Sequence, residues 1–237
     1  MISSRVAQFI IQNSRPKLDH FFRIIYVERY FESHKSQVSA ISLNVINKQI
    51  IVISGSLRKG SYTTAVCRAL VKQMNETHKA QAGNNIEFVL RDYVRELPTY
   101  DGDLDVNPAT NPDTQTPPAV VVDFRRELSE AHAIIIGTPE YNYNLPGGLK
   151  NVIDWASRPF AKHCLIGRRV GVFGCTPGER GGKAAVEYLR NIVPLLGATL
   201  VGPELLFPKI NSLITPEGQL DASVLSPLTE LAKELAQ

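Results

Sequence analysis

The chain has 237 residues, of which 43% are hydrophobic and 21% are charged, and its formal net charge is +3. This usage is ordinary for a globular protein with a sizeable apolar core. The three cysteines form no C-x-x-C pair and have no metal-ligand spacing with histidine, so neither a disulfide framework nor a zinc site is indicated. No apolar run approaches the roughly 20 residues that span a bilayer, and we expect a cytoplasmic protein that makes no membrane contact.

The positive charge belongs to the N-terminal segment. Residues 1–48 carry seven Lys or Arg and three Asp or Glu, which is +4, and subtraction from +3 leaves −1 for residues 49–237. A nearly neutral body lacks the basic surface that nucleic acid requires, so we expect no nucleic-acid partner. Residues 1–48 show no regular period. We interpret them as an extension that packs on the body or frays, while an organellar presequence and a docked helix also fit the pattern.

From residue 48 onward, short apolar runs alternate with segments of helical period. In chain order, the pattern predicts a strand over 49–55, a helix over 64–74, a strand over 85–93, a loop over 97–118, a helix over 119–131, a strand over 132–140, a helix over 147–159, a strand over 168–178, a helix over 181–198, a strand over 198–207 and a helix over 223–236. Pro194 is expected to bend or interrupt its helix. Regular alternation of this kind predicts a doubly wound α/β fold around a parallel sheet.

In such a sheet, a ligand binds beyond the carboxyl ends of the strands, at the point where the strand order reverses. Three loops that follow predicted strands are rich in polar and small residues, namely 55–63, 138–147 and 174–182. We expect these three loops to meet and to form one pocket.

The first of these loops reads GSLRKGSYT and lies between a strand and a helix. The first backbone N–H groups of a helix have no internal partner, and the helix dipole favours an anion beside them. Ser56, Ser61 and Thr63 add hydroxyl groups, and Arg58 adds a cation. The loop matches neither G-x-x-x-x-G-K-[ST] nor G-x-G-x-x-G. Taken alone, it fits a phosphate cradle and an ordinary strand–helix turn equally well.

The second loop reads TPEYNYNLPGG, and its prolines and glycines favour a stiff turn with an accessible backbone. Such a turn suits the edge of a flat heterocycle. The alternative is that Tyr141 and Tyr143 only pack in the core and that Glu140 is a solvated acid. On the helix that follows, we expect core packing for Trp155 and a local hydrogen bond for Asp154.

The third loop, GCTPGERGG, brings small residues and the hydroxyl of Thr176 to the same edge. Cys175 has no histidine or acid arranged beside it in the sequence, so we interpret it as a small residue at the end of a loop and not as a nucleophile. His132 and His163 are isolated from each other, and we assign neither a metal nor a catalytic role to them.

These three segments resemble the NADPH-dependent FMN reductase family. GSLRKGSYT is similar to the family's GSLRxxSxN phosphate motif, PEYNYNLPGGLKNVIDWASR to its PEYN-x-x-x-PG-x-LKN-x-IDW-x-SR block, and GCTPGERGGKAAVEYLR to its third flavin loop. The resemblance covers residues 49–237 and is closest to the bacterial chromate/quinone reductase branch. It implies a flavodoxin-like reductase domain over 49–237, with helices on both faces of the parallel sheet. Residues 1–48 have no counterpart and form an N-terminal extension.

The resemblance also implies an FMN site on the three loops. Residues 56–63 would hold the FMN phosphate, and the second and third loops would contact the flavin ring, largely through backbone groups. The implied cofactor-binding residues are Ser56, Arg58, Ser61, Tyr62, Thr63, Pro139, Glu140, Tyr141, Asn142 and Thr176. The family has Asn where this chain has Thr63, which keeps a hydroxyl donor but has one donor fewer and a shorter reach.

The resemblance implies that the protein is an NAD(P)H-dependent FMN or quinone reductase. Hydride would pass from NADPH or NADH through FMN to a small-molecule acceptor such as a quinone, an azo dye or chromate, in a ping-pong cycle. Because the cofactor carries this chemistry, no catalytic side chain is assigned. A homodimer or homotetramer is implied. Two alternatives remain open, a flavodoxin-like FMN electron carrier, against which the nearly neutral body argues, and a cofactor-free regulatory binding module.

Overall fold

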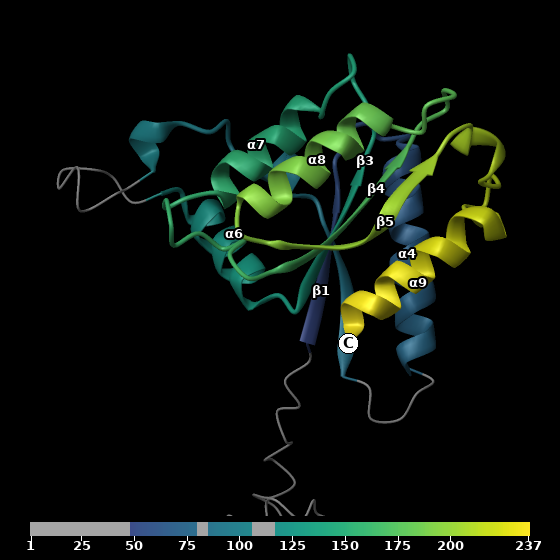
Figure 1. Cartoon of the computed structure of the whole chain (residues 1–237), viewed down its shortest axis with the longest axis horizontal. Coiled ribbons are helices and arrows are strands. Elements are labelled where there is room, and N and C mark those ends of the chain that lie inside the picture. The colour runs from purple at the N-terminus through teal and green to yellow at the C-terminus, as the bar shows by residue number, and fades with distance from the viewer. Residues whose placement is uncertain (1–47, 80–84, 106–116) are drawn as a thin grey trace, which may run out of the picture. The chain divides into compact units, whose positions relative to one another are not determined.

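The computed structural model describes residues 48–79, 85–105 and 117–237. Within these ranges, five parallel strands form one sheet in the order β2-β1-β3-β4-β5. The strands are β1 (Lys48–Ser54), β2 (Ile86–Arg91), β3 (Ala133–Thr138), β4 (Arg169–Cys175) and β5 (Thr199–Phe207). The predicted doubly wound, flavodoxin-like α/β fold is confirmed (Figure 1). The expectations for the N-terminal extension concern residues that lie outside the described part of the chain, except for Lys48, which begins β1.

The central strands read as nearly continuous apolar runs because both of their faces are covered. Successive side chains of a strand point to opposite faces of the sheet. In β1, Ile51 and Ile53 belong to the apolar cluster on one face, and Ile50 and Val52 belong to the cluster on the other. The edge strand β5 contains Pro203, which an edge position tolerates because one side of the strand makes no ladder.

Helices cover both faces of the sheet, as Figure 1 shows. One layer holds α5 (Tyr93–Glu96), α6 (Ala119–Glu130), α7 (Gly147–Ala156) and α8 (Lys183–Leu195), and the other holds α4 (Tyr62–Lys79) and α9 (Ala222–Ala236). Two single 3-10 turns, η1 (Gly102–Leu104) and η2 (Ile210–Ser212), lie in connections. No helix in the described part of the chain combines the length and the apolar character that crossing a bilayer requires.

Most predicted elements differ from the observed ones only at their ends. The sequence pattern missed α5, because a helix of four residues is too short to show a period. Pro194 lies one residue before the end of α8, so this helix stops at Leu195 and does not continue to residue 198. The proline therefore marks the end of the helix and does not bend its middle.

The layer that contains α7 is built around Trp155, which is fully buried. Its indole N–H donates to the carbonyl oxygen of Pro98 at 2.8 Å, and the guanidinium of Arg125 lies 5.5 Å from the centre of the ring. The carboxylate of Asp154 accepts from Nζ of Lys150 at 2.6 Å. Both expectations for this helix, core packing and a local hydrogen bond, are confirmed.

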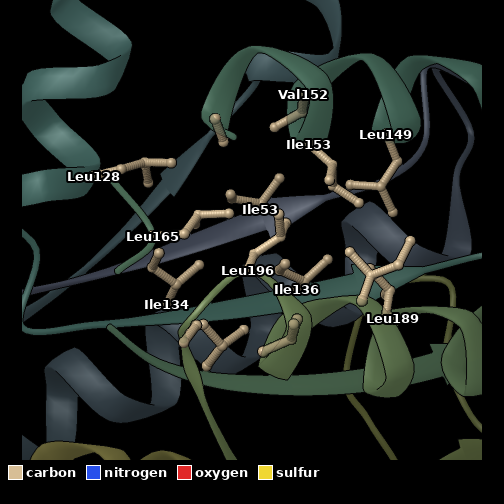
Figure 2. A pocket seen from close by; sticks show the side chains of 15 residues that line it. Ile53, Leu128, Ile134, Ile136, Leu149, Val152, Ile153, Leu165, Leu189 and Leu196 are labelled. Atoms are coloured by element: carbon tan, nitrogen blue, oxygen red, sulfur yellow. The ribbon is translucent and has the colours of Figure 1, made fainter. Parts of the chain in front are cut away.

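A cavity of about 20 Å³ lies in the same layer, between the sheet and helices α6, α7 and α8. Figure 2 shows the side chains of Ile53, Ile136, Leu149 and Leu189 converging on it. All of the lining residues are apolar, so a water molecule there would lack the two to four polar partners that it needs. The cavity is a packing gap in the core and offers nothing to hold a polar ligand.

Candidate functional site

The strand order reverses between β1 and β3, which are neighbours in the sheet although β2 separates them in the chain. At the end of these strands, the backbone N–H of Gly55 donates to the carbonyl oxygen of Gly137 at 2.7 Å. A Cβ atom on Gly137 would lie 2.4 Å from Cζ of Phe173, so only glycine fits this crossing. The chain leaves the sheet here toward opposite faces, which opens the position where doubly wound folds bind ligands.

Three loops extend from this edge of the sheet. Loop 1 is residues 55–61 between β1 and α4, loop 2 is residues 139–146 between β3 and α7, and loop 3 is residues 176–182 between β4 and α8. They correspond to the three loops that the sequence predicts to meet.

Loop 1 leads into a capped helix N-terminus. The hydroxyl oxygen of Ser61 accepts from the backbone N–H of Thr64 at 3.2 Å, which makes Ser61 the N-cap of α4. The N–H groups of Tyr62 and Thr63 lie in the first turn, where the helix itself offers no acceptor. Arg58 is exposed and forms no ion pair within the described residues. Free N–H groups, a helix dipole and a nearby cation together suit an anion.

Arg95 of α5 holds loop 1 in place. Its Nη2 donates to the carbonyl oxygen of Leu57 at 2.6 Å, and its Nε lies 3.1 Å from the carboxylate of Asp92. Ser56 is buried, and its hydroxyl oxygen accepts from the backbone N–H of Arg58 at 3.4 Å. Sequence reasoning missed Arg95, because no local pattern indicates a contact between residues 38 positions apart.

Loop 2 contains a tight hairpin. Tyr141 and Asn144 exchange two backbone hydrogen bonds of 3.1 and 3.0 Å. Between them, Asn142 and Tyr143 have φ angles of 51° and 59°, in the left-handed region. Asparagine adopts this conformation readily, whereas tyrosine there costs about 1 kcal/mol or more. Tyr141 and Tyr143 are 40% and 71% exposed, so the alternative that they only pack in the core is wrong.

Glu140 connects loop 2 to the start of α8. Its Oε2 accepts from the backbone N–H of Ala184 at 2.7 Å, its Oε1 lies 3.7 Å from Nε of Arg180, and its side chain is only 11% exposed. The alternative that Glu140 is a solvated acid is therefore wrong. The N-cap of α8 is Gly182, which has no side chain to cap the helix. Glu140 supplies the missing cap from the neighbouring loop, with its negative charge at the positive end of the helix dipole.

Two further contacts join the loops. The hydroxyl oxygens of Ser56 and Tyr141 lie 3.5 Å apart, which connects loop 1 to loop 2. The guanidinium of Arg180 lies 5.1 Å from the ring centre of Tyr143, which connects loop 3 to loop 2. These contacts confirm that the three loops meet, and the second part of the expectation, that they form one pocket, stays a prediction.

The side chain of Thr63 points toward strand β4 of the sheet. It is 2% exposed, and its hydroxyl oxygen accepts from the thiol of Cys175 at 3.4 Å. Burial raises the pKa of the Cys175 thiol to about 11, and the hydrogen bond with Thr63 offsets only part of this effect. The thiol therefore stays protonated, which fits its interpretation as a non-nucleophilic residue.

The remaining predicted residues lie at the mouths of loops 2 and 3. Pro139 directly follows β3, and its carbonyl oxygen accepts from the hydroxyl of Thr138 at 2.7 Å. Asn142 is exposed at the tip of the hairpin. Thr176 directly follows β4, and its backbone N–H donates to the carbonyl oxygen of Phe207 at 3.2 Å. All three residues lie in loops that follow the carboxyl ends of β3 and β4.

Comparison with known proteins gives a consistent result. The family model "NADPH-dependent FMN reductase" matches residues 49–212. A quinone reductase of Escherichia coli is 33% identical over 184 residues, which is 76% of this chain and 89% of that protein. An NAD(P)H-dependent FMN reductase of Pseudomonas aeruginosa is 32% identical over 190 residues, covering 80% of this chain and 89% of that one.

Among solved structures, a flavoenzyme from Paracoccus denitrificans described as an NAD(P)H:(acceptor) oxidoreductase superposes with a TM-score of 0.64. It is 28% identical, and the match covers 80% of this chain and 95% of that structure. The region that the family model matches, residues 49–212, contains all of the sheet except Lys48 and all three loops of the candidate site.

Proposed function

We propose that the three loops bind FMN and that the electron acceptor is a quinone. The premise is that this chain belongs to the family of NADPH-dependent FMN reductases. Members of this family are NAD(P)H-dependent oxidoreductases that act on FMN or quinones. One observation supports the site most strongly. Arg58, which forms no ion pair within the described residues, lies in the same loop three positions before Ser61, the N-cap of α4.

The phosphate end of FMN fits loop 1. A phosphate dianion would accept from the first-turn N–H groups of α4 and would pair with Arg58. The hydroxyl of Ser61 is already used as the N-cap, and that of Thr63 faces Cys175. In this chain, the backbone of the first turn and the arginine therefore do most of the phosphate binding. The replacement of the family's Asn by Thr63 does not remove these groups.

We infer that the ring end of FMN lies against loops 2 and 3. Pro139, Tyr141 and Asn142 would line the edge of the isoalloxazine, and Thr176 would contact it from the other side. Glu140 would not touch the ring, because its carboxylate is bound to Ala184 and lies beside Arg180. Its role in our proposal is to fix loop 2 against loop 3, so that the ring has one orientation.

The chemistry that FMN supplies when bound is the acceptance of hydride from a nicotinamide and the delivery of electrons to a second substrate. The residues of the chain bind FMN and orient it, and no side chain is required to move a proton. We propose quinones as the first acceptor class because a quinone reductase of E. coli is 33% identical to this chain. Azo compounds and chromate are further acceptors to test.

The proposal is tested by replacing the phosphate-binding cation. We expect Arg58→Gln to raise the dissociation constant of FMN about tenfold, since a hydrogen bond to a charged group contributes about 1.5–3 kcal/mol. Arg126→Gln, which removes an exposed arginine of α6 that pairs with Asp123 at 2.8 Å, is the matched control and should leave FMN binding unchanged. Equal FMN affinity in both variants would contradict the placement of the phosphate.

We also propose that the protein forms a homodimer or homotetramer. The side chains of Phe160 and Leu195 are 81% and 84% exposed, and contact with a second subunit would bury them. Light scattering after size-exclusion chromatography measures the molar mass directly. A single peak at the mass of one chain, 26.2 kDa, would contradict this part of the proposal.

A further inference from the structure

A polar hollow of about 410 Å³ lies between loop 1, the first turns of α4, and the end of β2 with the residues that follow it. Its lining residues are Ser54, Ser56, Arg58, Lys59, Thr64, Arg68, Leu90, Arg91, Asp92 and Arg95. Five of these residues are cationic and one is acidic. Loops 2 and 3 contribute none of them, so the hollow is not the space where the flavin ring is proposed to lie.

Two of the five cations are already held by partners. Arg91 donates from Nε to the carboxylate of Glu127 at 2.6 Å. Arg95 lies 3.1 Å from the carboxylate of Asp92 and donates to the carbonyl oxygen of Leu57 at 2.6 Å. These contacts fix the wall of the hollow on the β2 side and anchor loop 1 to it.

Of the other three cations, Arg58 is already proposed to pair with the FMN phosphate, which leaves Lys59 and Arg68 for a second anion. Neither of these two forms an ion pair in the described part of the chain. Cations that line one hollow without a counter-charge repel one another, and they attract small anions. Of the lining residues only Leu90 is apolar, so there is no apolar wall for a nucleobase or a flavin ring. The hollow is suited to a compact anion and not to a flat aromatic group.

Hydroxyl groups complete the donor set of the hollow. The side-chain oxygens of Ser54 and Thr64 lie 2.8 Å apart, and both residues line the hollow. Arg68, which also lines it, lies on α4 one helical turn after Thr64. A phosphomonoester dianion presents three acceptor oxygens, which cationic and hydroxyl donors of this kind satisfy. Ser61, Tyr62 and Thr63 do not line the hollow, so the N–H groups of Tyr62 and Thr63 that are proposed to bind the FMN phosphate are not part of it.

We propose that this hollow is a second anion site, distinct from the proposed FMN phosphate site, and that it takes a phosphomonoester dianion. Two sources carry this chemistry. One is the 2′-phosphate of NADPH, an assignment that rests on the proposed function, and the other is free phosphate. The first source would make the hollow a determinant of the preference for NADPH over NADH.

The proposal is tested by titrating inorganic phosphate into the FMN-loaded protein at low ionic strength and following the heat of binding. We expect one site per chain, and we expect Arg68→Gln to weaken binding about tenfold because it removes one charged donor. Lys72→Gln is the matched control, since Lys72 is exposed one turn further along α4 and does not line the hollow. It should bind phosphate like the unmodified protein.

The source is identified by steady-state kinetics on the same variants. If the 2′-phosphate of NADPH is the ligand, Arg68→Gln raises the ratio of KM for NADPH to KM for NADH about tenfold. If free phosphate is the ligand, this ratio stays constant while phosphate binding is still weakened. Both results support the second anion site.

Three results would overturn the proposal. They are the absence of phosphate binding to the unmodified protein, binding that Arg68→Gln leaves unchanged, and binding that disappears when FMN is added, since the flavin phosphate would then occupy the hollow itself. If the protein takes up no FMN at all, the proposed function fails, but the phosphate titration of the flavin-free protein still tests the hollow through Arg68.

Discussion

Replacement of Glu140 tests whether one side chain joins two loops of the site. Its carboxylate accepts from the backbone N–H of Ala184 at 2.7 Å, in the first turn of α8, and its side chain is 11% exposed. Because the N-cap position is Gly182, no side chain at the helix's own N-cap can take over this hydrogen bond. Glu140→Ala therefore leaves a donor at the start of α8 without its partner and releases loop 2 from loop 3.

The size of the effect follows from these contacts. A hydrogen bond to a charged group contributes about 1.5–3 kcal/mol, so we expect Glu140→Ala to lower the free energy of unfolding by about 2 kcal/mol. Glu140→Gln keeps an acceptor oxygen and loses only the charge at the helix N-terminus. The interaction of that charge with the helix dipole contributes about 0.3–1 kcal/mol, so we expect a loss of about 1 kcal/mol or less.

Urea unfolding followed by circular dichroism measures both losses. Glu187→Ala is the control, because Glu187 lies on the same helix in an exposed ion pair of 3.8 Å with Lys183. Exposed pairs of this kind contribute about 0–1 kcal/mol, usually near the low end. If Glu140→Ala costs no more than Glu187→Ala, the cap across the loops contributes nothing and our reasoning about loop 2 is refuted.

Three further predictions concern residues outside the proposed contacts with FMN. Cys175→Ser should retain quinone reduction within about twofold, because burial raises the pKa of the thiol to about 11 and its proposed role is packing against the start of α4; a complete loss of turnover in a folded variant would contradict this. Burial and, secondly, the charge of Lys48 lower the pKa of His132 in the folded state. The unfolded chain takes up this proton near pH 6.5, so the free energy of unfolding should fall as the pH decreases below about 6.5, and His132→Gln should flatten that fall in urea titrations at several pH values. Trp155→Phe should lower the free energy of unfolding by about 2 kcal/mol, since it removes the hydrogen bond to Pro98 and leaves a gap in a closed core. A melting temperature equal to that of the unmodified protein would refute this role of Trp155.

The fold could be predicted because its signals are local. Strand residues such as Ile50 to Ile53 form continuous apolar runs, since a central parallel strand is covered on both faces. The position of the site followed from topology alone, because loops after parallel strands meet at one edge of the sheet. The residues in these loops were identified by their types and by a family resemblance, and their roles as FMN ligands remain predictions.

The contacts that shape the site could not be predicted, because they join residues far apart in the sequence. Glu140 and Ala184 are separated by 44 positions, and no pattern in either segment indicates the other. The hairpin of loop 2 was missed for a different reason. Its turn places Asn142 and Tyr143 in the left-handed region, whereas the usual sequence signal for such a turn is Asn followed by Gly.

We propose that the three loops hold a flavin that NADPH reduces. The most direct test is the visible spectrum of the purified protein before and after anaerobic addition of NADPH. We predict absorption bands near roughly 375 and 450 nm, as oxidised flavins show in general, and their bleaching when NADPH is added. Bands that persist would indicate an electron carrier or a different reductant. A colourless protein that takes up no added FMN would contradict the account and leave only the fold.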